Sequence, residues 1–455
     1  MFLSSFRRSH VKRRVGLIAA AAFFWVYGEL CGTPPKSAML SSMNDTQLYH
    51  QLLGVEAPWY VADVRLDIEE EAVYITLDFD GKTANFACPK CQRFANLYDR
   101  RETRSWRHLD SCQFKTYLVA SMPRVSCRQH GILTSPVFWS EEGSRFTQMF
   151  ETFALHVLQA TQVQARAAHL LRLSPGQIHD LMHRAVTRGL KRRDTTELIP
   201  DLSVDEKSFQ AGHKYVSILS DPCQKRVLDL VEGRSQEAVE ELFTSSLTYQ
   251  QREKVCSVSM DMWLPFMNAR EKLIPNADTV HDRYHVSAYL NDAVDKTRRA
   301  ENRELTRHDD TLLHKTKYLW LRSDANMTDK QRTALEALTC LELETAKVWA
   351  FKESFRQFFA CTTEYGARSL FMAWHEAALA FGNVHLTKVA QMLYRHLEGL
   401  VAYIRHHVTN ATAEGLNAQI QQIKSNAKGF RKWGNFRIAI LFFLGKLDLY
   451  PQKTP

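Results

Sequence analysis

Two short pairs of metal-ligand residues constrain the N-terminal part of this chain more than any other feature. Cys88 and Cys91 flank Pro-Lys, and Cys127 and His130 flank Arg-Gln. In each pair, the two-residue spacing lets one tight turn present both side chains, and three thiolates with one imidazole complete a tetrahedral Zn²⁺ shell. We therefore expect a structural zinc site in a finger over residues 88–130. The alternative is four unrelated residues of a reduced protein.

The number and spacing of the cysteines indicate the cellular compartment. The chain has nine cysteines, an odd number at irregular spacing, which is not typical of a disulfide scaffold and favours a reducing cytosol. Cys112 lies between the two ligand pairs and could replace one ligand. An isolated cysteine is more often a small buried side chain, and we expect that role for Cys112.

A leader precedes Met43. Two arginines are followed by the apolar run 15–27, which has the composition of a signal peptide and is too short to span a bilayer comfortably. The alternatives are export of a secreted or membrane-anchored protein and a start site placed too far upstream, with Met39 or Met43 as the true beginning. We favour the second and expect a cytoplasmic, nucleoid-associated protein without a membrane partner.

Length and charge indicate a multidomain protein with a polyanionic partner. The chain has 455 residues and a net charge of +9; its length predicts several domains, and its charge favours nucleic acid over an acidic membrane surface. After the leader (1–42), the residue patterns divide the chain into an N-terminal domain (43–140), a basic helical segment (145–193), a mixed α/β segment (198–285), a helical block (286–408) and a final segment (409–455).

The segment 145–193 has the pattern of a helix-turn-helix. Ser174 suits an N-cap, Pro175 the first helical position and Gln177 the capping box. A preceding helix is expected over 150–171, so that the second, basic helix could lie in the major groove of DNA. A plain helical hairpin with a solvated face is the alternative. The expected DNA-facing side chains are His183, Arg184, Thr187, Arg188 and Lys191.

Three carboxylates are candidates for a second metal site. Asp205 follows the apolar run 202–204 and Asp261 follows the run 255–260, so both are expected at strand ends, where α/β sheets place reactive groups. Glu414 begins a helix whose same face carries Lys424 and Lys428. Carboxylates with DNA phosphate suit Mg²⁺. Because the chain has 50 acidic residues, the residues alone do not single out these three.

Longer motifs give these acids a family context. Ser-Val-Asp-Glu at 203–206, Met-Asp-Met-Trp at 260–263, Asp-Arg-Tyr-His-Val at 282–286 and the block from Asn410 through Glu414-Gly-Leu-Asn to Phe436 together resemble the ISL3 family of bacterial insertion-sequence transposases. The resemblance covers nearly all of the chain after Met43, including the zinc pairs. The block around Glu414 is its most specific part, and the leader departs from the family pattern.

The resemblance implies a fold and an activity. Such proteins are similar to DDE transposases, so it implies a ribonuclease H-like catalytic domain with an all-helical insertion, in a multidomain α+β chain. Asp205, Asp261 and Glu414 would bind two Mg²⁺ (or Mn²⁺) ions. Asp282 and His285 match an Asp-x-x-His motif as auxiliary site residues, and a purely structural role for the two is equally favoured.

The resemblance also implies a partner and a reaction. The protein would bind double-stranded DNA at the terminal inverted repeats and hydrolyse one strand at each end. The freed 3′ hydroxyl would then attack target DNA, and no covalent protein intermediate would form. Holding two ends implies a homodimer or a larger assembly. The rival hypothesis is a zinc and helix-turn-helix regulator that is derived from a transposase and has lost catalysis.

Overall fold

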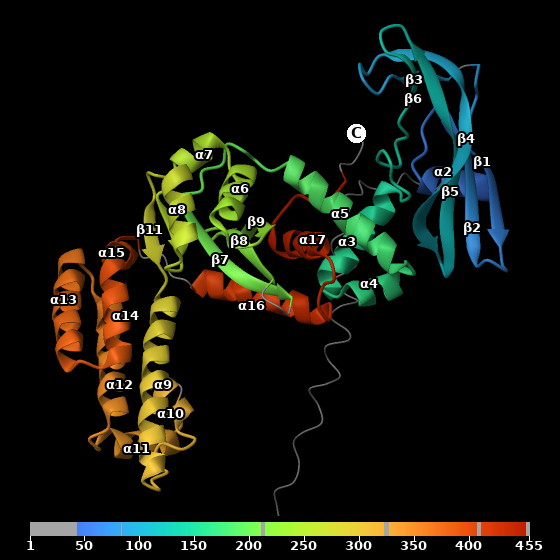
Figure 1. The fold of residues 1–455 in the computed structure, drawn as a ribbon. Helices are drawn as coiled ribbons and strands as arrows, with labels where there is room; N and C mark the ends of the chain where they lie inside the picture. The colour runs from blue at the N-terminus through green and yellow to red at the C-terminus, as the bar shows by residue number, and fades with distance from the viewer. Residues whose placement is uncertain (1–42, 83, 211–213, 323–326, 407–410, 452–455) are drawn as a thin grey trace, which may run out of the picture. The chain divides into compact units, whose positions relative to one another are not determined.

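The computed structural model describes residues 43–82, 84–210, 214–322, 327–406 and 411–451, without the side chains of residues 210, 411, 413 and 414. The chain divides into two compact units, Met1–Val137 and Phe138–Pro455, coloured from blue to red along the chain in Figure 1. The leader lies outside the described residues, so its origin stays a prediction. No helix in the described ranges is long and apolar enough to cross a membrane.

The described residues of unit 1 form one helix and a six-stranded sheet of order β1-β2-β5-β4-β3, with β6 paired to β5. β2 is the strand predicted from alternating apolar residues, and Val73, Ile75, Leu77 and Phe79 are all buried, as expected. The elements are α2 (Asp45–Leu52), β1 (Trp59–Asp67), β2 (Ala72–Phe79), β3 (Asn85–Ala87), β4 (Phe94–Ser111), β5 (Phe114–Cys127) and β6 (Gly131–Thr134).

A long antiparallel hairpin of β4 and β5 organises unit 1. The turn at 88–91 joins β3 to β4, and the turn at 127–130 joins β5 to β6. Because β3 pairs with the beginning of β4 and β6 with the end of β5, both turns lie at the same end of the hairpin. The rings of Trp59, Phe79 and Phe86 contact one another edge to face. The unit therefore has an aromatic core of its own beside the ligand turns.

Three helices begin unit 2: α3 (Gln148–Thr161), α4 (Gln164–Leu171) and α5 (Pro175–Lys191). The prediction of one helix over 150–171 was wrong. Gln162 adopts the left-handed conformation with φ 53°, and its backbone N–H donates to the carbonyl of Leu158. A left-handed residue of this kind ends a helix, and no glycine or proline announces it in the sequence.

The start of α5 was predicted correctly. The Ser174 hydroxyl accepts a hydrogen bond from the N–H of Gln177, and the Gln177 side chain accepts one from the N–H of Ser174. This reciprocal pair is a capping box, which satisfies two N–H groups that the first turn would otherwise leave unpaired. The apolar face expected for α5 is buried at Ile178, Leu181, Met182, Ala185 and Val186.

A five-stranded mixed sheet of order β11-β10-β7-β8-β9 forms the middle of unit 2, in agreement with the predicted mixed α/β segment. β8 runs antiparallel to both of its neighbours, β7 and β9, whereas β10 runs parallel to β7 and β11 runs parallel to β10. The strands and their connecting helices are β7 (Asp201–Gln210), β8 (Lys214–Asp221), β9 (Arg226–Glu232), α6 (Gln236–Ser246), α7 (Tyr249–Glu253), β10 (Ser257–Met260), α8 (Leu264–Leu273) and β11 (Asp278–His281).

The two faces of β7 have different environments. Leu202 and Val204 are buried in one cluster with Phe243 of α6 and Phe266 of α8. Successive side chains of a strand point to opposite faces. Asp205 therefore lies on the face away from this cluster.

Residues 283–406, as far as they are described, form helices and contain no strand. Their shared core includes Trp320, Phe355, Phe358, Phe371 and Trp374. The helices are α9 (Arg283–Arg307), α10 (Lys317–Leu321), α11 (Asp329–Thr339), α12 (Glu344–Phe355), η2 (Arg356–Ala360), α13 (Glu364–Phe381), α14 (Val384–Arg395) and α15 (Leu397–His406).

The last two helices return to the sheet. α16 (Ala411–Asn426) lies beside β7, and α17 (Trp433–Leu444) contacts β9 and α5 (Figure 1). Arg437 of α17 donates two hydrogen bonds of 2.7 Å to the carboxylate of Asp229 on β9. Residues 202–210 and 411–426, which the helical block separates in the sequence, therefore lie side by side in the fold.

A close approach between α15 and β11 leads to a prediction. A Cβ atom at Gly399 would lie 2.7 Å from Nε2 of His281, and the His281 ring is buried, so neither can move freely. Gly399→Ala should therefore lower the free energy of unfolding by about 1–3 kcal/mol, the usual cost of overpacking. Urea unfolding measures this. Gly434→Ala is the matched control because its Cβ would meet no atom within 4 Å; equal loss in both variants would contradict the steric explanation.

Candidate metal centre and candidate active site

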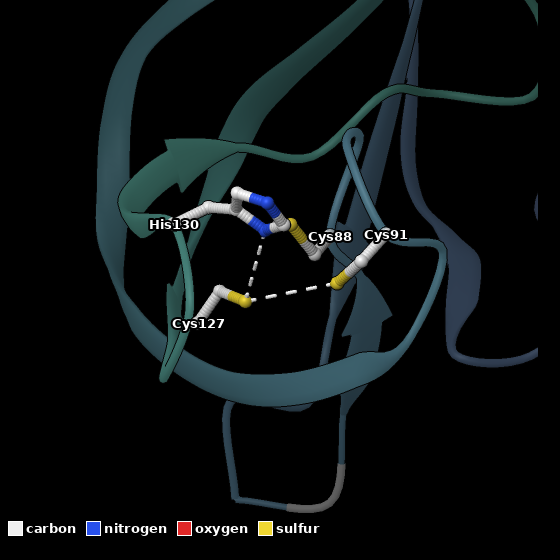
Figure 2. Close-up of side chains that lie close together, drawn as sticks. All are labelled: Cys88, Cys91, Cys127 and His130. Carbon is white, nitrogen blue, oxygen red and sulfur yellow. Dashed lines mark hydrogen bonds between the residues drawn. The ribbon is translucent and has the colours of Figure 1, made fainter.

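The four ligands predicted in unit 1 lie together. Their ligand atoms, from Cys88, Cys91, Cys127 and His130, are all within 4.8 Å of one another, as Figure 2 shows. The Sγ atoms of Cys91 and Cys127 are 3.8 Å apart, and Nδ1 of His130 is 3.7 Å from Sγ of Cys88 and 3.6 Å from Sγ of Cys127.

These distances fit a tetrahedral zinc ion. Zn–S bonds of about 2.3 Å and Zn–N bonds of about 2.0–2.1 Å imply edges of about 3.8 Å between two sulfurs and about 3.6 Å between sulfur and nitrogen. The three measured edges agree with these values. The Cys₃His cluster thus has the donor set and the size of a structural zinc site.

The turns also favour the thiolate form that binds metal. The backbone N–H of Cys91 lowers the pKa of Cys88, and the backbone N–H of Gln129 does the same for the pKa of Cys127. The N–H of Arg93 acts in the same direction on Cys91, but burial and the two neighbouring thiols outweigh it and raise the pKa of Cys91. A bound cation would relieve this repulsion between sulfurs.

Cys112 differs from the expectation of a small buried residue. It is exposed, and it lies at the turn between β4 and β5 with φ 57°. Its position is at the end of the hairpin away from the ligand turns, and it is not one of the clustered ligands.

Asp205 and Asp261 lie on neighbouring parallel strands of unit 2. The register pairs Asp201 with Ser257, Leu202 with Val258 and Ser203 with Ser259. The recorded pairing ends at Ser203 and Ser259, and each aspartate follows two residues later on its own side of the pair. Asp261 directly follows β10, as predicted, but Asp205 lies inside β7 and not at its end, because β8 pairs along β7 as far as Gln210.

Helix α16 covers the Asp205 side of β7. Nδ2 of Asn417 donates a hydrogen bond to Oδ2 of Asp205, and Nζ of Lys424 donates one of 2.8 Å to the carbonyl of Ser208. The side chain of Glu414 lies outside the described residues. In the sequence of α16, Glu414 comes three residues before Asn417. Lys428 is exposed beyond the end of the helix.

The first turns of α9 supply two partners for Asp261. The hydroxyl of Tyr289 lies 3.3 and 3.4 Å from the two carboxylate oxygens, and Nδ1 of His285 lies 3.7 Å from Oδ2. Burial, together with the charge of Asp261, raises the pKa of Tyr289 to about 12, so this hydroxyl stays protonated and donates. Tyr289 was not predicted from the sequence as a site residue. Its spacing of four residues from His285 is the one signal that pointed to a shared helix face.

Asp282 and His281 are buried and make contacts that support the fold. Asp282 is buried and caps α9, with Oδ1 accepting from the N–H of Tyr284 at 2.8 Å. Burial lowers the pKa of His281 to about 4, and Nδ1 of the neutral ring lies 3.2 Å from the carbonyl of Met260. Of the two expected auxiliary residues, His285 lies beside Asp261, whereas Asp282 caps the start of α9.

The basic face predicted for α5 is only partly available. His183, Thr187 and Lys191 are exposed. Arg188 is buried, and its guanidinium pairs with Glu141 and Glu151, while Arg184 makes longer ion pairs, at 3.4 Å, with the same two carboxylates. Arg184 and Arg188 were expected to face solvent, and this expectation was wrong. Both cations pair with carboxylates that lie more than 30 residues away in the sequence.

This ion cluster gives a second prediction. Glu151 is 1% exposed, so Glu151→Gln would remove the more deeply buried of the two carboxylates that pair with the buried Arg188. Breaking a buried pair costs about 3–5 kcal/mol, and we expect a loss of this order in the free energy of unfolding. Asp448→Asn is the matched control, because Asp448 makes an exposed pair with Arg192 and such pairs contribute about 0–1 kcal/mol. Similar losses in the two variants would contradict the argument.

Two family models match this chain. The model described as "Transposase", of the DDE type and the ISL3 group, matches residues 202–440, which is more than half of the chain. The model described as "zinc-finger of transposase IS204/IS1001/IS1096/IS1165" matches residues 84–130. The first match spans Asp205, Asp261 and Glu414, and the second spans all four clustered metal ligands.

Curated relatives carry the same description. The "Transposase for insertion sequence element IS1001" of Bordetella parapertussis is 25% identical over 357 residues, covering 78% of this chain and 87% of the relative. The "Transposase for insertion sequence element IS1557" of Mycobacterium tuberculosis is 23% identical over 422 residues, covering 86% of this chain and 93% of the relative. The similarity therefore extends over most of both chains.

Proposed function

The chain belongs to the ISL3 family of transposases, and from this we propose that it cuts and joins DNA strands at the ends of an insertion sequence, using divalent metal ions held by Asp205, Asp261 and Glu414. The observation that supports the proposal is the β7–β10 register, which pairs Ser203 with Ser259, two residues before Asp205 and Asp261. α16, which contains Glu414, lies against the same strand through hydrogen bonds from Asn417 and Lys424.

Within this site each side chain has a task that its chemistry suits. Carboxylates are hard oxygen ligands, which Mg²⁺ and Mn²⁺ prefer. Asn417 and Tyr289 hydrogen-bond to the two aspartates and hold their orientation, as outer partners of metal ligands do. Bound Mg²⁺ ions would supply activation of the attacking oxygen and stabilisation of the leaving oxygen.

We further propose that the catalytic part is ribonuclease H-like. Three antiparallel strands, followed by two strands that add in parallel on the other side of β7, agree with the mixed sheet expected from the family. The helical block from α9 to α15 lies in the chain between Asp261 and α16. It is then an insertion before the last catalytic helix.

DNA recognition is assigned to two modules. α4 and α5, joined by the short turn at 172–174, form the proposed helix-turn-helix, and the exposed His183, Thr187 and Lys191 of α5 would face the major groove. Lys424 and Lys428 would contact phosphates beside the acids. The zinc ribbon would complete recognition of the terminal inverted repeats. A homodimer or larger assembly in the cytoplasm, bound to the nucleoid, would hold two ends together.

The test is a strand-cleavage and strand-joining assay. Purified protein is incubated with duplex DNA that carries the inverted repeats flanking its own gene, in Mg²⁺, in Mn²⁺ and in a chelator, alongside a duplex with scrambled repeats. We expect specific binding to the repeats in all buffers, with cutting and joining only when metal is present.

Two outcomes would contradict the proposal. Specific binding without cutting in either metal would favour a regulator derived from a transposase. Cutting that persists in the chelator would show that the three carboxylates do not act through divalent ions.

A further inference from the structure

A segment without helix or strand follows α17 and lies across the helices at the beginning of unit 2. It comprises residues 446–451, and the helix that precedes it, α17, contacts α5 (Figure 1). Leu449 is 2% exposed and Pro451 is also buried, so the segment is packed against the rest of the unit. We call residues 446–451 the strap.

Two arginines of α5 hold the strap. The guanidinium of Arg192 pairs with the carboxylate of Asp448 at 3.0 Å and donates a hydrogen bond of 2.6 Å to the carbonyl of Tyr450. The guanidinium of Arg188 donates to the carbonyl of Leu449. Three successive residues of the strap are therefore bound by side chains of one helix.

Gly189, which lies between these arginines, lets the strap come close to α5. A Cβ atom at this position would be 2.6 Å from Cβ of Leu447 and 3.2 Å from the carbonyl oxygen of Asp448. Carbon atoms pack at about 3.5–4.0 Å, so no larger residue fits here unless the strap moves. A glycine inside a helix costs roughly 0.5–1 kcal/mol relative to alanine. The helix is thus less stable by itself at the point where the strap crosses it.

The strap also contacts α3 and the turn between β8 and β9. The hydroxyl of Tyr450 donates a hydrogen bond of 2.6 Å to Oε1 of Gln159, and the Tyr450 ring centroid lies 4.9 Å from that of His156. Nζ of Lys446 donates one of 2.7 Å to the carbonyl of Gln224, between β8 and β9. The strap therefore connects the helices α3 and α5 to the sheet.

These contacts are on the side of α5 away from the proposed DNA-facing residues. Arg192 follows His183 by nine positions, which is about two and a half turns at 3.6 residues per turn, so the two side chains point in opposite directions. His183 and Thr187 are exposed, whereas Arg192 binds the strap. The strap holds α5 from behind and leaves its exposed face free.

We propose that the strap is a positioning element, which fixes α5 relative to the carboxylate site and thereby sets which phosphodiester bond is cut. The inference rests on the proposed function, in which α5 binds the repeats and the carboxylates cut the DNA. Arg437 and Asp229 join α17 to β9, which belongs to the same sheet as β7 and its Asp205. The strap continues this connection from α17 to α5. It acts through α5 and does not touch the reacting atoms.

Gly189→Ala tests the proposal, because it should displace the strap without removing any of its hydrogen-bonding groups. Alanine favours the helix itself, so α5 should stay folded and the affinity for the repeats should not change. Cutting of the native bond should slow by up to about a hundredfold, the cost of a misplacement of roughly 1 Å, and neighbouring bonds should be cut as well. The measurements are gel-shift binding and single-turnover cleavage of end-labelled DNA in Mg²⁺, mapped to single nucleotides.

Two further variants isolate the strap. Leu447→Gly, added to Gly189→Ala, removes the two side-chain atoms of residue 447 that lie close to the new Cβ. The strap can then return, and cutting should again be confined to the native bond. Gly434→Ala on α17 is the matched control, because its Cβ would meet no atom within 4 Å. It should bind and cut as the wild-type protein does.

A distance measurement reports the position of α5 in the absence of DNA. Spin labels are attached through Asp180→Cys on α5 and Glu271→Cys on α8, two exposed positions, in a protein whose exposed native cysteines are replaced by serine. With the strap in place, the two labels should give one narrow distance distribution. Gly189→Ala should broaden or shift this distribution, and the added Leu447→Gly should narrow it again.

The outcomes separate the strap from the proposed function. A single, unchanged cut position in Gly189→Ala would overturn the proposal, whatever the distance distribution. Loss of repeat binding in the same variant would overturn it in favour of a strap that only keeps α5 folded. Absence of metal-dependent cutting by the wild-type protein would count against the proposed function. The distance distribution then decides on the strap, and an unchanged distribution in Gly189→Ala would show that the strap does not hold α5.

Discussion

Replacing Asp205 or Asp261 by asparagine should lower the rate of strand cleavage by more than about a hundredfold. Loss of a residue that only hydrogen-bonds to a metal ligand already lowers metal affinity or activity about 10–100-fold. Each of these variants would remove a charged ligand that binds the hard cation directly. Asparagine keeps the shape of the side chain, so the sheet should fold normally. Single-turnover cleavage of end-containing DNA in Mg²⁺ measures the effect.

The affinity of these variants for DNA should not fall with the cleavage rate. Removing a carboxylate near DNA phosphates relieves like-charge repulsion, so gel-shift affinity for the ends should persist or rise slightly. Asp292→Asn is the matched control, since Asp292 lies on the same helix as Tyr289 and makes an exposed pair with Lys296, of the kind that contributes little. Near wild-type cleavage by Asp205→Asn or Asp261→Asn would remove that residue from the site.

The double variant Cys88→Ser, Cys91→Ser should lose its zinc, from about one ion per chain to none, because two of four ligands are gone. Zinc binding contributes about 10–16 kcal/mol in finger peptides, comparable with the whole stability of a domain. The ends of the hairpin around β3 and β6 should therefore loosen. The aromatic core around Trp59 and Phe79 is expected to stay folded.

Metal analysis and hydrogen exchange over residues 85–134 test this. Cys112→Ser is the control, since Cys112 is exposed and outside the cluster, and it should keep its zinc. Full zinc retention in the double variant, or equal loss in the control, would be incompatible with the Cys₃His site.

Local patterns in the sequence predicted the parts of this protein whose partners lie close in the chain. The spacing of Cys88 and Cys91 identified a ligand turn, and Ser174 with Gln177 identified the start of α5. The apolar run before Asp261 correctly placed that residue directly after a strand. In each case the physical cause, a turn, a cap or a buried strand, acts over a few residues.

Features that depend on distant partners could not be predicted in this way. Arg188 looked like a solvent-facing cation, and only the fold brings Glu141 and Glu151 to it. Most of β4 was not predicted, because its first twelve residues are mostly polar and all of them are exposed or half-buried. Tyr289 acquires its contact with Asp261 from the crossing of α9 and β10.

The position of the metal ions tests the central claim most directly. Fe²⁺ can replace Mg²⁺ in an oxygen-ligand site, and in the presence of ascorbate and peroxide it generates radicals that cut the polypeptide next to the ion. We predict three sets of fragments, with cuts near Asp205, Asp261 and Glu414, all suppressed by excess Mg²⁺. Cuts near the two aspartates without one near Glu414, or cuts elsewhere in the chain, would contradict a site built from these three carboxylates.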